Sequence, residues 1–159
     1  DRLRSRGLGD VYKRQSKKST PIKIHLETEI TQDGQTESHV FDEEGELIQM
    51  GTTTYLRYLE HAQGQETAVR FKLVEDGQVQ LTRGTEKDAT QLRLYFKMHD
   101  AQGSLYQTQY GNLPVLTTTN HLLMTLSDEP LSGEVVVHYQ LEISQQVVGD
   151  YKLRLIFNA

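Results

Sequence analysis

The stretch Val69–Arg83, VRFKLVEDGQVQLTR, carries the strongest hairpin signal in the chain. Apolar residues occupy every second position on both sides of Asp76-Gly77. A period of two is typical of a strand with one buried face. Asp-Gly between two such runs is a strong hairpin signal, because the tight turn needs positive φ at its central residues. The stretch therefore predicts an antiparallel β-hairpin.

The same alternation continues over most of the chain, and no segment has the period of an amphipathic helix. We expect about ten strands, mostly joined by short turns that place sequential strands side by side. An apolar sheet face with no helix to cover it must curl onto itself. The sequence predicts an all-β fold, a single up-and-down antiparallel β-barrel with little or no helix. The other runs are 22–30, 40–41, 47–50, 52–60, 92–96, 104–110, 113–118, 120–126, 135–142 and 149–157.

Composition limits the class of protein. The chain has 159 residues with 36% hydrophobic content, which suits one domain with its own core. It has no cysteine, and no run approaches the roughly 20 apolar residues of a membrane-spanning helix. No signal peptide is visible. We expect a cytoplasmic protein, since a chain without cysteine suits a reducing compartment.

The first fifteen residues differ from the rest. Asp10–Gln15 can be back-translated into a string that resembles the transposase end sequence used in DNA sequencing libraries. We expect Asp1–Gln15 to be a non-native, disordered adapter, the alternative being a basic tail, and residues 16–159 to form the barrel domain. Leaving out its five basic and two acidic residues takes the formal net charge from −5 to −8. So acidic a domain is a poor partner for nucleic acid or an anionic membrane.

Seven short stretches have a shared order and spacing: Phe41–Gly45, Tyr55–Glu60, Val79–Gly84, Leu92–Phe96, Tyr106–Gly111, Val137–Leu141 and Gly149–Tyr151. Together they resemble the YwiB-like family, bacterial proteins with a domain of unknown function. The resemblance covers about residues 20 to 157 and excludes the first fifteen. It implies a calycin-like barrel, the broad class that includes lipocalins, and it implies no catalytic residues.

Strand phase points to candidate site residues. Arg83 shares the apolar face of Val79 and Leu81, so strict alternation aims it inward. Glu60 shares a face with Leu56 and Tyr58, although Tyr55 and Leu59 compete for the core side of that strand. Two inward charges would have to pair, because isolated burial costs several kcal/mol. Hydroxyls on inward phases could join them, namely those of Tyr106, Thr108, Tyr110 and Tyr139.

Two interpretations of Arg83 stay open at this stage. In the first, Arg83, Glu60, Tyr106, Thr108 and Tyr139 anchor a small, partly apolar or amphiphilic ligand in or at the mouth of the barrel. In the second, Arg83 caps a strand end or reaches to water while Glu60 is exposed. The core would then be filled, and the protein would be an interaction or structural module. A barrel of about eight strands can be filled or can hold one ligand.

Chemical motifs are absent from the sequence. There is no G-x-S-x-G elbow, phosphate loop or H-E-x-x-H. The six histidines are scattered without metal-ligand spacing, so we expect no metal, no cofactor and no catalytic residue. An enzyme centred on Glu60 and Arg83 is the exception that the sequence leaves open. The oligomeric state is not predicted.

Overall fold

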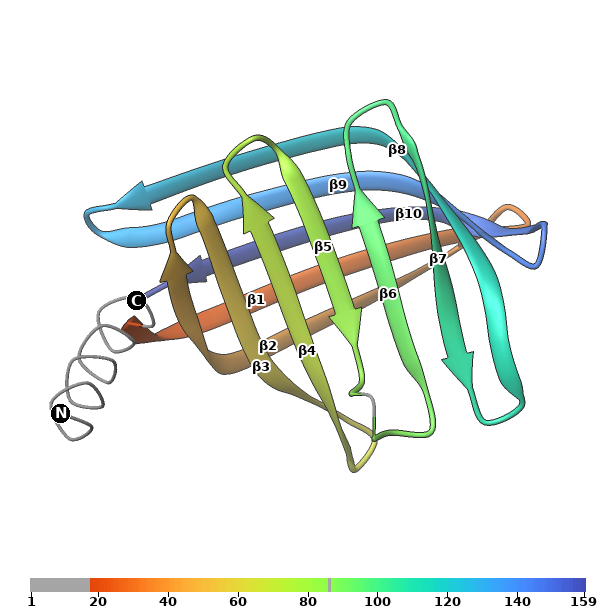
Figure 1. The fold of residues 1–159 in the computed structure, drawn as a ribbon, viewed down its shortest axis with the longest axis horizontal. Coiled ribbons are helices and arrows are strands. Elements are labelled where there is room, and N and C mark those ends of the chain that lie inside the picture. The colour runs from red at the N-terminus through yellow and green to blue at the C-terminus, as the bar shows by residue number, and fades with distance from the viewer. Residues whose placement is uncertain (1–17, 86) are drawn as a thin grey trace, which may run out of the picture.

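The barrel in Figure 1 is built from ten strands, in a computed structural model that describes residues 18–85 and 87–159. The expected adapter, Asp1–Gln15, lies outside the described residues. No described helix is long and apolar enough to cross a membrane. The strands are β1 (Lys18–Gln32), β2 (Gln35–Met50), β3 (Thr53–Ala62), β4 (Gln65–Val74), β5 (Gln78–Arg83), β6 (Gln91–Phe96), β7 (Ala101–Thr108), β8 (Gly111–Asp128), β9 (Leu131–Ile143) and β10 (Gln146–Asn158).

Every strand pairs antiparallel with its sequence neighbours, and β1 closes the barrel against β10. The closing register runs from Lys23 opposite Asn158 to Thr31 opposite Asp150. The predicted up-and-down antiparallel barrel is confirmed. The Val69–Arg83 hairpin forms as expected, with Gly77 in its turn at φ 102°.

The runs 40–41 and 47–50, expected to be separated by a break at Glu43-Glu44-Gly45, are parts of one strand, because β2 runs through these residues. Gly45 is the point where β2 begins to pair with β3 while it still pairs with β1. A Cβ at Gly45 would lie 2.6 Å from the Arg57 carbonyl oxygen and 2.8 Å from Ile24 Cδ1. Glycine is needed there for close packing of neighbouring chains, and this need resembles a turn signal in the sequence.

The runs 113–118 and 120–126 belong to one strand, β8. The register with β9 shifts between Thr119 and His121, so Asn120 forms a β-bulge. β8 pairs with β7 from Gly111 to Thr118, and it pairs with β9 from Val115 to Asp128. Figure 1 shows β8 and β9 extending together beyond the shorter strands.

The core fills the barrel with alternate side chains of every strand. Phe71, Leu56 and Leu155 have no exposed surface. The joint between β6 and β7 is the weakest in the wall, with two register pairs against five for β5–β6 and eight for β7–β8. This seam lies next to Arg83, because Leu92 is opposite Arg83 on one side and Tyr106 on the other.

Candidate functional site

A buried ion pair lies on the inner face of the barrel wall. Glu60 is at the end of β3 with 3% of its surface exposed, on the same face as Leu56 and Tyr58, while Leu59 is about half exposed. Arg83 ends β5 opposite Val69 and donates from Nη2 to Glu60 Oε1. The core side of β3, ambiguous in the sequence, is therefore the side that carries Glu60.

The pair leaves hydrogen-bonding capacity unused. The other carboxylate oxygen of Glu60, Oε2, is buried without a partner, and so is the Tyr58 hydroxyl. Burial, followed by the negative charge of Glu60, raises the pKa of Tyr58, so its hydroxyl stays protonated. Arg83 keeps 30% of its side chain exposed, against 4% for Glu60. Arg83 therefore reaches solvent, whereas Glu60 faces the closed interior.

Tyr139 lies on the inner face of β9 within an aromatic stack. Its ring centroid is 4.6 Å from that of Phe96 and 5.0 Å from that of Tyr151, with which it is nearly parallel. Burial raises the pKa of Tyr139, and the charge of Arg83 opposes this rise. Thr119, opposite Tyr139 on β8, has a buried hydroxyl without a partner. Tyr139 thus adds a neutral hydroxyl to the polar part of the interior.

Within the described part of the chain, no hydrogen bond joins the remaining expected site residues to the pair. Tyr106 is half-buried on β7, opposite Leu92. The Thr108 hydroxyl donates to the Gly111 carbonyl and accepts from the Tyr110 amide, so it holds the β7–β8 turn. Tyr110 does not face the interior as expected, because it is 91% exposed at that turn. A turn hydroxyl at the end of an alternating strand has the same sequence signature as an inward one.

Five clefts of the described residues open on the outer surface, among them the groove that Arg57, Arg70 and Arg93 line. None of these five is lined by Glu60, Arg83, Tyr106, Thr108 or Tyr139. The interior around the pair is closed in this conformation. A ligand at the pair would need the wall to open.

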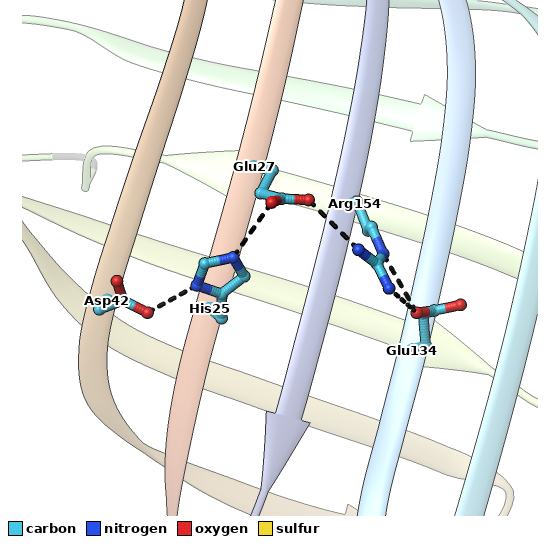
Figure 2. Close-up of polar contacts among 5 residues, drawn as sticks. All are labelled: His25, Glu27, Asp42, Glu134 and Arg154. Carbon is cyan, nitrogen blue, oxygen red and sulfur yellow. Dashed lines mark hydrogen bonds and ion pairs between the residues drawn. The ribbon is translucent and has the colours of Figure 1, made fainter.

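The outer surface carries a second polar network, which sequence reasoning missed (Figure 2). His25 Nδ1 lies 2.6 Å from Asp42 Oδ1, and its Nε2 lies 3.4 Å from Glu27 Oε1. These carboxylates raise the pKa of His25. Arg154 joins Glu27 to Glu134 at 3.5 and 2.9 Å. All five side chains are at least a third exposed, and such exposed pairs are typical of a solvated strand ladder.

Metal ligation has no geometric support in the part of the chain that the structure describes. No three His, Asp or Glu side chains there lie close enough to hold a metal ion.

The chain brings together Glu60, Arg83 and Tyr58, and places Tyr139 near them. The chemistry of this group is hydrogen bonding around a charge-neutral pair.

These features define a class, the closed ten-stranded antiparallel β-barrels with a polar pair in the wall. Within it the chain belongs to the family described as Domain of unknown function (DUF1934), whose family model matches residues 24–155. The structure is similar to the crystal structure of the ywiB protein from Bacillus subtilis, with a TM-score of 0.77. That match has 21% identity and covers 93% of this chain and 98% of that chain. No curated protein matches the sequence.

The two matches confirm the resemblance to the YwiB-like family that the seven stretches indicated. At 21% identity the structural likeness shows the fold alone. The function therefore has to be argued from the side chains of this barrel.

Proposed function

We propose that the barrel binds one small, partly apolar molecule whose polar head group lies on the Glu60–Arg83 pair. The observation that carries this proposal is the buried Glu60 Oε2, which has no hydrogen-bond partner although Oε1 accepts from Arg83. A buried polar atom without a partner costs about 1–3 kcal/mol, and more when charged. A donor group on a ligand would remove that cost.

The charges at the pair favour an uncharged head group. Glu60 and Arg83 sum to zero, so a carboxylate head would bring a net negative charge into the wall beside Glu60. An amide or hydroxyl head avoids this. It can donate to Glu60 Oε2 and accept from Arg83 or from the protonated Tyr58 hydroxyl.

The apolar part of the ligand has a surface beside the pair. Leu92 lies opposite Arg83, and Tyr106 lies opposite Leu92, both half-buried. They belong to the β6–β7 seam, which two register pairs hold. Local opening is easiest where few backbone hydrogen bonds must break. We expect the ligand to enter through this seam, with its tail along Leu92 and Tyr106.

The test uses ligands that share a tail and differ in the head group. Thermal-shift and native mass-spectrometry measurements would compare decanamide, 1-decanol and decanoate. We expect decanamide and decanol to raise the melting temperature and to add one ligand mass per chain. Decanoate should bind more weakly than either.

Neighbouring residues supply matched variants. Tyr106→Ala should weaken decanamide binding, whereas Leu105→Ala, which changes the exposed side chain next to it, should not. Arg83→Gln should weaken binding, and the outer-surface change Arg154→Gln should have no effect. The proposal is overturned if no uncharged amphiphile binds the unmodified chain, or if the Tyr106 and Arg83 variants bind as it does.

We infer a binding role rather than an enzymatic one. Catalysis by Glu60 would need a carboxylate free to act on a reacting atom, but Arg83 already pairs with this one. A turnover that Glu60→Gln abolished without loss of stability would reverse this inference.

A free strand edge favours a second function, the pairing of two copies of the chain. Beyond Thr119, no strand pairs with β8 on its β7 side among the described residues. Asn120–Ser127 carries no Asp, Glu, Lys or Arg, so two such edges can pair antiparallel without repulsion. The free part of β2, before Glu44, is acidic by contrast, with Glu37, Asp42 and Glu43.

Light scattering coupled to size-exclusion chromatography tests this second function. We expect a dimer that Leu123→Lys converts to a monomer, because lysine on an edge strand prevents edge pairing. Leu105→Lys, at a similarly exposed position away from the free edge, should leave the dimer intact. A monomeric unmodified chain would exclude this function.

A further inference from the structure

The outer face of the wall holds a groove of about 820 Å³. One register row crosses it, with Glu46 opposite Arg57, Arg57 opposite Arg70, Arg70 opposite Thr82, and Thr82 opposite Arg93. Thr82 is buried although it points outward. The arginines on both sides of Thr82 therefore lie above the floor of the groove.

Cations exceed acids in this groove. Arg57, Arg70, Lys87 and Arg93 line it together with two carboxylates, those of Glu44 and Glu46. Arg57 donates to Glu46 Oε2 from Nε at 3.0 Å and from Nη2 at 2.8 Å. Among the described residues, no carboxylate lies within 4 Å of the other three cations. The described residues of the lining thus have a formal charge of about +2 in an otherwise acidic protein.

Two features of this row leave its interactions unsatisfied. The Arg93 Nε is buried and has no hydrogen-bond partner. Arg57 and Arg70 are directly opposite each other, and like charges in that position destabilise a sheet. A bound anion would screen the repulsion between the arginines, and it would satisfy the Arg93 donor once that side chain turns toward the groove.

One side of the groove is apolar. Leu59 and Ala68 are register partners, and both line the groove. Leu59 keeps about half of its surface exposed. An exposed leucine next to a cationic row suits a ligand with an apolar group joined to a charged one.

We propose that this groove binds a phosphate monoester with an apolar group, the phosphate between Arg70 and Arg93 above Thr82. A phosphate monoester carries about −1.5 to −2 charges near pH 7, which matches the lining. Arginine binds phosphate oxygens through two parallel N–H bonds, so the two guanidiniums supply directed donors. The apolar group lies on Leu59. This site is on the opposite face of the wall from the Glu60–Arg83 pair.

Isothermal titration with phenyl phosphate tests the proposal, with phenol, inorganic phosphate and benzoate as comparison ligands. We expect phenyl phosphate to bind more tightly than all three, and to weaken as salt rises. Arg93→Gln and Arg70→Gln should each weaken it about tenfold or more. Arg70 is exposed, so its variant keeps the test valid if Arg93→Gln fails to fold.

The control is Arg154→Gln, which changes an outer-surface arginine held by carboxylates on other strands. It should bind phenyl phosphate as the unmodified chain does. The proposal is overturned if phenyl phosphate does not bind at millimolar concentration, or if the Arg70 and Arg93 variants bind normally. Equal affinity for benzoate would exclude the phosphate, and equal affinity for inorganic phosphate would exclude the apolar contact.

Discussion

The inner and outer faces of the β3–β6 wall carry two register rows that are one residue apart. The inner row passes through Val69, Arg83 and Leu92, and the outer row through Arg70, Thr82 and Arg93. A step of one residue moves a side chain to the other face of a sheet. Both rows contain arginine. The inner Arg83 pairs with buried Glu60, whereas Arg70 and Arg93 of the outer row line the groove and have no ion-pair partner among the described residues.

The two faces hold different sets of charges because their side chains differ in exposure to solvent. Inside, low exposure forces the charges to balance, and the balanced pair favours an uncharged polar group. Outside, solvent tolerates an excess of cations, and the excess favours an anion. On each face, burial determines which charged side chains are tolerated and how much stability is lost when one of them is removed.

The largest expected effect is on the inner pair. Arg83→Leu should lower the free energy of unfolding by about 3–5 kcal/mol, because it leaves the Glu60 carboxylate buried and unpaired. Urea unfolding measures this change. The double variant Glu60→Leu/Arg83→Leu should regain most of the loss. A loss below about 1 kcal/mol for the single variant would mean that solvent already reaches Glu60, and would remove the contrast between the two faces.

A smaller effect separates two adjacent residues of β6. Leu94 is 2% exposed on the inner face, so Leu94→Ala should cost at least about 2 kcal/mol through the lost packing. Arg93→Ala, on the outer face, should stay within about 1 kcal/mol in the absence of ligand. The same urea measurement checks both. Equal costs would show that the outer arginine is a core element rather than part of a binding surface.

The smallest effects concern two outer histidines with opposite surroundings. Asp42 and Glu27 raise the pKa of His25. The stability that His25 contributes is therefore full below its pKa in the unfolded chain, about 6.5, and is lost as pH rises through its pKa in the folded protein. Burial, His121 and Lys152 lower the pKa of His138 despite Glu29. Protonation of His138 therefore costs no stability above about pH 6.5, and the protein loses stability as pH falls from there toward the pKa of His138 in the folded protein.

Melting temperatures at pH 5.5 and pH 8 would show the two signs. His25→Gln should destabilise the protein more at pH 5.5 than at pH 8. His138→Gln should stabilise it relative to the unmodified chain at pH 5.5 and change little at pH 8. Shifts of the same sign for both variants would contradict the assignment of their surroundings.

The fold follows from the sequence because alternation is a local signal that sums over many strands. The inward direction of Arg83 came from two apolar neighbours on its own strand, Val79 and Leu81. The face of Glu60 did not follow, since leucine and tyrosine stand on both sides of β3. Only the register of β3 with β4, set by the turn at Gln63-Gly64, places Leu56 opposite the core residue Phe71.

The outer arginine row was missed for the same reason. Arg57, Arg70 and Arg93 are ordinary polar-phase residues within their own strands, and only cross-strand register brings them into one line. The hairpin turns fix that register. Knowing which residues form each turn would therefore have predicted that these arginines lie in one row. Thr108 shows the opposite limit, because alternation cannot tell a turn hydroxyl from an interior one.

The most direct measurement follows the arginine side chains by NMR, with guanidinium nitrogens labelled and signals assigned through the glutamine variants. We predict that decanamide shifts the Arg83 signal and leaves Arg70, Arg93 and Arg154 unchanged. An Arg83 signal that exchanges with water as fast as Arg154 and ignores decanamide would contradict the claim that the inner pair is a closed site for an uncharged head group.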